Sequence, residues 1–335
     1  MKKLLLRLLR DLLLKLIVIV VIGDWLFTVA GYLGHFHWSL DLFSHFRVQY
    51  LVVALACVAG FGCFRARWWV LIGLGCALLN AVVIVPWYLP RSLSEARPRA
   101  HNFRVLLCNV LWKNQNYAAV IDLVQAEKPD VFVLQEAEGQ WLRAMRPLAS
   151  EYPFQRNVLE HDGRIGCFSR HELQDAGAGV ASGNPHQRIV TRLDLNGRSV
   201  SIITLHAPSP LSREESQERN RQLSEIALVA RQLPPPTIVV GDFNASLWTP
   251  YFTEMVRDSG LVEARKGFGV LPTWPNFSAT LNRPLGVNIF PLVKIPVDHC
   301  LVSPDIKVVN CRTGSDVGSD HLPLIVDLFI DANKR

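Results

Sequence analysis

Three long apolar stretches in the first 90 residues constrain the fold more than any other feature of the chain. They run over Leu16–Leu33, Val48–Phe64 and Trp68–Leu89. Each has a length suited to crossing a hydrocarbon layer about 30 Å thick. Tryptophan and tyrosine stand at several of their edges, as at a membrane interface. The sequence therefore predicts a membrane anchor over residues 1–90 with three transmembrane helices, and a lipid bilayer as partner. A buried helical hairpin of a soluble domain is the alternative.

Asp24 interrupts the first apolar stretch. A carboxylate inside a membrane span marks a functional site by default. It can equally have a structural role, either facing a partner helix or lying near the interface with Trp25, and we favour this structural interpretation over a functional one.

The charged residues predict how the chain is oriented. Residues 1–100 carry 11 Lys and Arg against 4 Asp and Glu, whereas residues 101–335 carry 24 against 25. The larger part therefore lacks the overall positive charge of a nucleic-acid-binding domain. Seven basic residues lie before the first stretch or between the second and third, and five lie on the other side. The positive-inside rule then places the N-terminus in the cytoplasm and residues 101–335 outside it, at the cell membrane.

Beyond a polar, proline-containing linker at residues 91–101, the pattern changes to short β-branched runs separated by turn residues. The predicted strands are Arg104–Asn109, Val131–Gln135, Gly163–Ser169, Arg188–Leu195, Ser199–Leu205, Thr237–Val240, Val297–Ser303 and Pro323–Phe329. Asn196–Gly197 is typical of a two-residue hairpin turn. The predicted helices are Tyr117–Glu127, Gly139–Ala149, Arg213–Gln232 and Pro250–Asp258. Hairpins mixed with long helices indicate an α+β domain of two mostly antiparallel sheets, packed face to face with helices outside.

Acids, amides and imidazoles stand where the predicted strands end. They occur at residues 108–109, 135–136, 206 and 241–244, with further clusters at 297–299 and 318–321. Because neighbouring strand ends in a sandwich share one rim, we expect these side chains to converge. Hydrolysis of a phosphate ester by a hard metal ion needs such a set.

Seven short motifs resemble those of the endonuclease/exonuclease/phosphatase superfamily, whose members include DNase I-like nucleases, inositol polyphosphate 5-phosphatases and neutral sphingomyelinases. They are LLCN at 106–109, LQE at 134–136, LHAP at 205–208, GDFN at 241–244, TW at 273–274, VDH at 297–299 and SDHLP at 319–323. The resemblance covers residues 102–330. It implies a DNase I-like four-layer α/β/β/α sandwich, with a catalytic domain at residues 102–335. It also implies metal-assisted, in-line attack of water on a phosphodiester or phosphomonoester.

The resemblance implies a metal site at Glu136, completed or supported by Asn109 and Asp320. Hard carboxylate oxygens suit Mg²⁺, for which Mn²⁺ is a substitute. A glutamate at a strand end is otherwise a solvated surface residue, and Asn109 alone suits a turn equally well. Leu111 stands where many nuclease members carry a second acid, so we expect one metal ion rather than two.

The remaining site residues would carry the reaction. Asp242 and Asn244 are two apart, so on an extended segment both point the same way. Asp242 would align or deprotonate the attacking water and Asn244 would donate to a phosphoryl oxygen; an Asx-turn is the alternative. His321 resembles the catalytic histidine, and Asp298 the acid that orients it. His206 would contact a nonbridging oxygen or help to protonate the leaving group. His299 is interpreted as structural.

The predicted substrate is a phospholipid or a nucleic acid, and no protein partner is predicted. Anchoring at a bilayer raises the effective concentration of a lipid. The stretch Phe268–Pro296 is poor in acids and carries aromatic residues that would either reach the membrane interface or pack on themselves. Two other functions stay open: a catalytically silent phosphate-binding module, and a membrane protein that this domain regulates.

Overall fold

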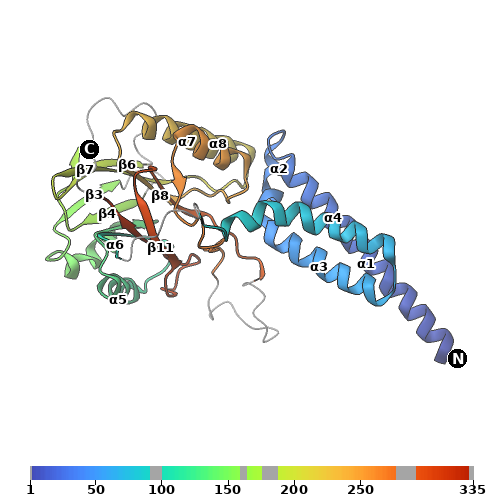
Figure 1. Ribbon diagram of the computed structural model, residues 1–335. Helices are drawn as coiled ribbons and strands as arrows, with labels where there is room; N and C mark the ends of the chain where they lie inside the picture. The colour runs from blue at the N-terminus through green and yellow to red at the C-terminus, as the bar shows by residue number, and fades with distance from the viewer. Residues whose placement is uncertain (1, 91–99, 159–163, 176–187, 277–291, 332–335) are drawn as a thin grey trace. The chain divides into compact units, whose positions relative to one another are not determined.

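The computed structural model describes residues 2–90, 100–158, 164–175, 188–276 and 292–331. The chain divides into two compact units, one mainly of Met1–Tyr88 and the other of Leu89–Leu247 with Tyr251–Arg335 (Figure 1). The first is helical, and the second holds both sheets.

The helical unit contains three segments long and apolar enough to cross a membrane, at residues 2–32, 38–63 and 67–87. Its helices are α1 (Lys2–Tyr32), α2 (Trp38–Asp41), α3 (Arg47–Cys63) and α4 (Arg67–Ile84), with 3-10 turns at Leu42–Phe46 and Val85–Trp87. The predicted first span began at Leu16, whereas α1 begins at Lys2. The added residues are mostly leucine, lysine and arginine, which favour helix strongly, so the helix extends through the charged segment.

Asp24 faces the interior of the helical unit rather than its surface. Its Oδ2 accepts a hydrogen bond of 3.3 Å from Sγ of Cys76 on α4. Thr28, one turn later on α1, accepts a hydrogen bond of 3.0 Å from Asn80. Asp24 thus faces a partner helix, α4, which is one of the two structural positions expected for it.

Two six-stranded sheets form the second unit. Sheet A has the order β11-β12-β1-β2-β4-β3, and sheet B the order β5-β6-β7-β8-β10-β9. The strands are β1 (Phe103–Asn109), β2 (Val131–Gln135), β3 (Phe154–Val158), β4 (Ile165–Ser169), β5 (Gln174–Asp175), β6 (Arg188–Leu195), β7 (Arg198–His206), β8 (Thr237–Asp242), β9 (Val262–Glu263), β10 (Asp298–Val302), β11 (Lys307–Thr313) and β12 (Leu324–Phe329). Within each sheet one pair, β1 with β2 and β7 with β8, is parallel, and the other pairs are antiparallel.

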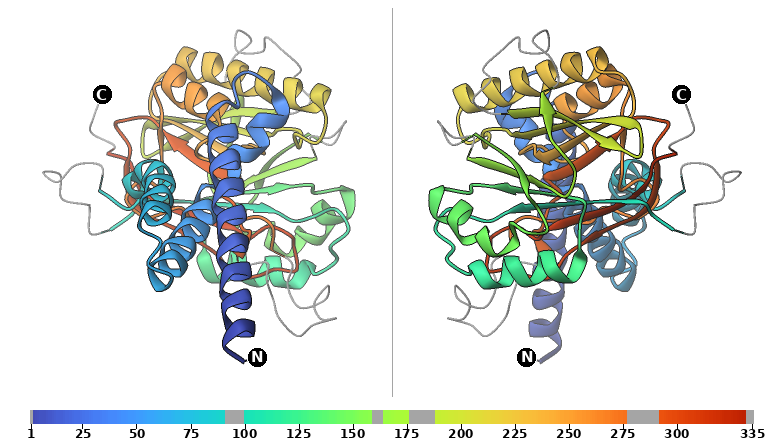
Figure 2. Two further views of the ribbon diagram at one scale, coloured as in Figure 1. Left: turned by 90° about the vertical axis from the view of Figure 1, so that its right-hand side faces the viewer. Right: turned by 90° about the vertical axis from the view of Figure 1, so that its left-hand side faces the viewer.

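Helices cover the outer faces of both sheets (Figure 2). They are α5 (Tyr117–Glu127), α6 (Gly139–Ala144), α7 (Arg213–Gln232) and α8 (Pro250–Ser259). Alternate residues of β1 serve two cores: Val105 and Leu107 join the core between the sheets, whereas Leu106 packs with α5 and α6. Because both faces of β1 are buried, its sequence is a nearly continuous apolar run rather than an alternation of apolar and polar residues. The resulting DNase I-like layers confirm the predicted fold class.

All eight predicted strands are present within one or two residues of the expected bounds in the described part of the chain, although residue 163 lies outside it. Four strands were not predicted: β3, β5, β9 and β11. The predicted helix Gly139–Ala149 was wrong in length, since α6 ends at Ala144 and a 3-10 turn follows at Arg146–Leu148. Pro147 has no backbone N–H to continue an α-helix. Asn196 and Gly197 both have positive φ, as the predicted hairpin turn requires.

Candidate active site

Strand pairing brings the predicted residues to one rim. Asn109 and Gln135 are register partners at the ends of the parallel strands β1 and β2. His206 and Asp242 hold the same relation at the ends of β7 and β8. Asp298 begins β10 and pairs with Asp242 from the antiparallel side. Both sheets therefore present polar side chains at the same edge.

Gln135 joins the two sheets at this rim. Its Nε2 donates to the carbonyl of Leu205, and its Oε1 accepts a hydrogen bond of 2.8 Å from the backbone N–H of Asp242. The side chain is fully buried. A second contact joins the two sheets here, because Nδ2 of Asn109 in sheet A lies 3.2 Å from Oδ2 of Asp242 in sheet B. Sequence reasoning missed this role; the available signal was a carboxamide closing the apolar run VFVLQ.

Close approach of backbones explains Gly241. A Cβ at this position would lie 1.9 Å from the carbonyl oxygen of Leu205. No other residue type fits between β7 and β8 here without separating them. The glycine therefore allows His206 and Asp242 to reach the same point.

Glu136 and Asn109 lie in contact. Nδ2 of Asn109 donates to Oε1 of Glu136 at 3.1 Å, and the backbone N–H of Trp112 donates to Oε2 at 3.1 Å. Glu136 has a φ of 56° and Leu111 a φ of 58°, both in the left-handed region that non-glycine residues rarely adopt. Backbone strain of this kind gathers at functional sites.

Asp320 lies next to Ser319, which contacts Asn109, and its own side chain contacts Trp274. The hydroxyl of Ser319 donates to the carbonyl of Asn109 at 2.6 Å, and Nε1 of Trp274 donates to Oδ2 of Asp320 at 3.2 Å. Ser319 and Trp274 were not predicted as site residues, although both fall in recognised motifs. Glu136, Asn109 and Asp320 offer oxygen atoms, the donor chemistry of a hard divalent cation such as Mg²⁺.

His321 and Asp298 form a buried hydrogen-bonded pair. Nδ1 of His321 lies 2.8 Å from Oδ2 of Asp298. Because an ionised carboxylate only accepts, Nδ1 carries the proton. Nε2 of His321 then lies 3.7 Å from Oδ2 of Asp242, and Nε2 of His206 lies 3.8 Å from the same atom. Two imidazoles thus flank one carboxylate.

The charges of these groups are strongly perturbed. Burial and the neighbouring Asp298 raise the pKa of Asp242 to about 6, against the opposing effect of the two histidines. Burial opposes the charge of Asp298, but His321 outweighs it and holds the pKa of Asp298 below its usual value. Burial also opposes protonation of His321, and Asp298 and Asp242 together raise its pKa to about 10. Near neutral pH the site therefore holds an imidazolium beside two carboxylates.

Asn244 adopts a conformation that the sequence did not predict. Strand β8 ends at Asp242, and Asn244 has a φ of 45°, so the expected extended spacing was wrong. Its N–H donates to Oδ1 of Asp242 at 2.8 Å, which is the Asx-turn held open as the alternative. Its Nδ2 donates to the carbonyl of Ala207 at 2.8 Å, and Ser209 lies 3.2 Å from its Oδ1. The turn therefore joins the backbone of Asn244 to Asp242, while its carboxamide contacts Ala207 and Ser209.

Asp242, Asp298 and His321 also have ligand atoms within 4.8 Å of one another, close enough to hold a cation among the described residues. The hydrogen bond between His321 and Asp298 uses one atom of each, as the hydrogen bonds from Asn109 and Trp112 use both oxygens of Glu136. The metal site expected at Glu136, Asn109 and Asp320 stays a prediction.

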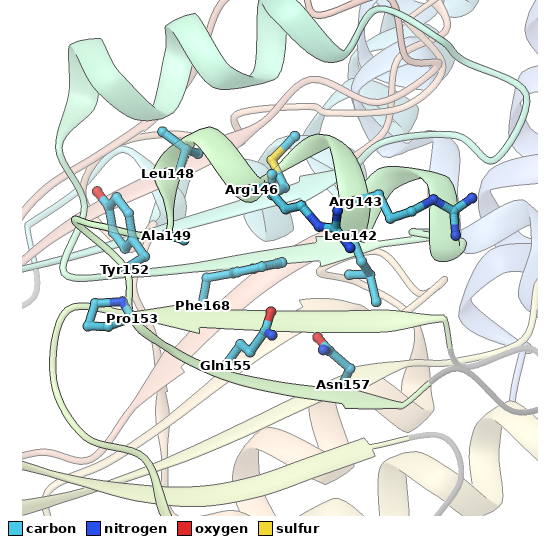
Figure 3. Close-up of a pocket in the computed structure, with 11 residues that line it drawn as sticks. Leu142, Arg143, Arg146, Leu148, Ala149, Tyr152, Pro153, Gln155, Asn157 and Phe168 are labelled. Carbon is cyan, nitrogen blue, oxygen red and sulfur yellow. The ribbon is translucent and has the colours of Figure 1, made fainter.

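A separate hollow of about 260 Å³ lies between α6 and the strands β3 and β4 (Figure 3). Apolar side chains such as Phe168 and polar ones such as Gln155, Asn157, Arg143 and Arg146 line it together. None of the eight predicted site residues lines it. The active site is thus located by convergent polar geometry rather than by this hollow.

Comparison with known proteins defines the class of this fold and site. Residues 102–321 match the model of the endonuclease/exonuclease/phosphatase family. The match covers most of the chain, and the chain belongs to this family.

Particular relatives are distant. A phospholipase C of Staphylococcus aureus is 24% identical over 198 residues, which covers 48% of this chain and 60% of that protein. The chain thus matches only about three fifths of the length of this curated relative. Among solved structures, an endonuclease/exonuclease/phosphatase protein from Beutenbergia cavernae has a TM-score of 0.50 at 19% identity, covering 69% of this chain and 72% of the other. A humanized D. rerio TDP2 has a TM-score of 0.51 at 17% identity, covering 68% and 98%. These two structures share the fold.

Proposed function

We propose that the protein is a membrane-anchored, divalent-metal-dependent phosphodiesterase. The observation that carries the proposal is the buried His321–Asp298 pair, whose second imidazole nitrogen, Nε2, faces Asp242. Asp242 in turn contacts Asn109, and Asn109 contacts Glu136. A proton-transfer group and an oxygen-rich cation site are thereby adjacent, which hydrolysis of a phosphate ester requires.

The proposed cation site consists of Glu136, Asn109 and Asp320. When bound there, Mg²⁺ or its substitute Mn²⁺ would neutralise charge on the phosphoryl group and make a water molecule more acidic. Oε2 of Glu136 is kept in place by the N–H of Trp112, and Asp320 by the indole of Trp274. These contacts orient the carboxylates before any substrate arrives.

The reaction would proceed by attack of water on phosphorus. The Asp242 carboxylate accepts a proton from the water, and Asn244 donates a hydrogen bond to a phosphoryl oxygen as negative charge grows there. The imidazolium of His321, oriented by Asp298, stabilises the same charge. His206, on the other side of Asp242, contacts a nonbridging oxygen or protonates the departing oxygen.

A phospholipid is the substrate that we favour. The curated relative from Staphylococcus aureus is named phospholipase C, and three apolar helices precede the catalytic unit. Residues 101–335 carry 24 basic against 25 acidic side chains, without the excess of positive charge that nucleic acid attracts. We propose an anchor at residues 1–90, a linker at 91–101 and a catalytic domain at 102–335. The predicted membrane-reaching stretch falls mainly on residues 277–291, outside the described part of the chain.

The proposal is tested with the full chain in phospholipid nanodiscs. Release of phosphorylated headgroup is measured from phosphatidylcholine and sphingomyelin vesicles, and cleavage is measured with single- and double-stranded DNA. We expect Mg²⁺-dependent headgroup release that EDTA abolishes. His321→Ala should lower it about 10²–10⁴-fold. Cleavage of DNA alone would instead support the nucleic-acid alternative.

The matched control is His171→Ala. Nε2 of His171 lies 3.4 Å from Oδ1 of Asp130, so it also belongs to a histidine–aspartate pair. Its other contacts are with Ser169 and Phe103, which are not site residues. Its activity should stay within twofold of the parent. Phosphate binding without turnover of any substrate would leave the silent-module alternative and remove the phosphodiesterase.

The predicted orientation has its own test. Reporter fusions at the C-terminus should be active only where the reporter works outside the cytoplasm. A signal from a cytoplasmic reporter would reverse the orientation and leave the phosphodiesterase proposal intact.

A further inference from the structure

A buried ionic cluster of Glu263, Arg265 and His299 lies behind the candidate active site. Their exposed fractions are 3%, 0% and 0%. Glu263 ends β9, Arg265 follows it in the next turn, and His299 is the second residue of β10. None of the three belongs to the eight predicted site residues.

Glu263 contacts both other members of the cluster. Nε of Arg265 lies 2.9 Å from Oε1 of Glu263, and Nδ1 of His299 lies 3.3 Å from Oε2 of the same carboxylate. Nε2 of His299 lies 2.7 Å from the carbonyl oxygen of Ala245. Because a carbonyl oxygen only accepts, Nε2 of His299 donates to Ala245. Arg265 and His299 thus both contact the carboxylate of Glu263.

The cluster holds the backbone on both sides of the reaction site. Nη2 of Arg265 donates to the carbonyl of Asp298, the residue that orients His321. His299 donates to Ala245, the residue directly after Asn244. The guanidinium also donates to the carbonyl of Val270 at 2.9 Å. One rigid group of charges therefore fixes the backbone at Asp298 and the turn that carries Asn244.

Stability alone is a weak reason for such a cluster. Removing the ion pair of Arg265 and Glu263 from water carries a large desolvation penalty, and well-packed apolar residues of similar volume are often as stabilising. Ionic contacts do, however, impose a fixed geometry on the groups they join. The directions of these hydrogen bonds, toward two catalytic backbone segments, indicate what geometry is being fixed.

We propose that Glu263, Arg265 and His299 act as positioning residues that hold Asp298 and Asn244 in catalytic register. The inference rests on the proposed phosphodiesterase function and deepens it. The cluster touches neither substrate nor metal ligand; it acts through the backbone of the residues that do.

His299→Phe is the first test. The ring of His299 packs against Phe243 and Phe252, with centroids 5.1 and 4.1 Å apart, so phenylalanine preserves the packing and removes both ring nitrogens. We expect kcat to fall about 10–100-fold, as for loss of supporting hydrogen bonds around other catalytic groups, while KM stays within twofold. His299→Gln retains an N–H for the carbonyl of Ala245 and should recover part of the loss.

The matched control is Asp327→Asn. Asp327 is a buried acid whose Oδ1 lies 2.5 Å from Nε of Arg104, in sheet A and outside the cluster. It should lower the unfolding temperature, as breaking a buried pair does, without changing kcat below that temperature. A kcat loss in Asp327→Asn equal to that in His299→Phe would show a general loss of stability and overturn the inference.

Hydrogen–deuterium exchange of the full chain supplies a readout independent of turnover. His299→Phe should speed exchange in peptides covering residues 242–247 and 297–300, and Asp327→Asn should not. Unchanged exchange there, or a kcat within twofold of the parent, would overturn the positioning role. If the parent hydrolyses no phosphodiester, the proposed function fails, and exchange still decides whether the cluster holds these segments.

Discussion

Replacing Asp298 by asparagine separates the charge of the His321–Asp298 pair from its shape. Asparagine occupies the same volume and can still meet Nδ1 of His321, but it carries no charge to hold the proton there. The pKa of His321 rises from 6.5 to about 10, with Asp298 the first of the groups that raise it. At 1.36 kcal/mol for each pH unit, this corresponds to about 5 kcal/mol in favour of the imidazolium.

Losing roughly 3–5 kcal/mol of this stabilisation in the transition state lowers kcat about 10²–10⁴-fold. KM should change little because Asp298 is buried and contacts His321. The assay is headgroup release by the full chain in nanodiscs with saturating Mg²⁺, with Asp327→Asn as the control for a buried aspartate elsewhere. An Asp298→Asn enzyme within threefold of the parent would refute the reasoning.

Three further outcomes are expected. Activity should rise with pH through about 6, since the raised pKa of Asp242 leaves its carboxyl group protonated at lower pH. It should fall near pH 10, where His321 loses its proton. A pH profile flat from 5 to 8 would contradict this. Gly241→Ala should destabilise the fold by about 3 kcal/mol or more, measured by thermal unfolding, because the new Cβ meets the carbonyl of Leu205 at 1.9 Å; an unchanged unfolding temperature would show that the strands separate freely. Glu136→Gln should raise the Mg²⁺ concentration needed for half-maximal activity at least tenfold, and an unchanged requirement would place the ion elsewhere.

The sequence predicts most of the sheet framework because the signals are local. The four residues before Gln135 form an uninterrupted apolar run, and Asn196–Gly197 is a turn that only a few residue types form. Strand β11 was not predicted, although valine and threonine favour strands, because Cys311 is its one buried residue and no alternation of buried and exposed residues marks it. Helix α1 was predicted too short because its first residues combine charge with strong helix propensity, and only the apolar part was read as a span.

The candidate site is predictable as a set of residues but not as an arrangement. Motif spacing identifies Asp242, Asp298 and His321 without indicating that a hydrogen bond of 2.8 Å joins the last two. Gln135 was not predicted as a site residue because it acts by hydrogen-bonding across the two sheets, and a local sequence pattern does not indicate which strands lie opposite each other. His299 was interpreted as structural from the behaviour of isolated histidines, and the structure gives it partners that its own sequence neighbourhood does not contain.

The two sheets repeat one design. In each, a parallel pair joined through a helix, β1-α5-β2 or β7-α7-β8, is flanked by antiparallel neighbours in the same order. Asn109 and Glu136 belong to one copy, and His206 and Asp242 to the other, so each copy alone holds half of the chemistry. The rate of turnover should therefore depend on how the two sheets pack against each other. A ligand that spans them would resist their separation and raise the unfolding temperature while it is bound.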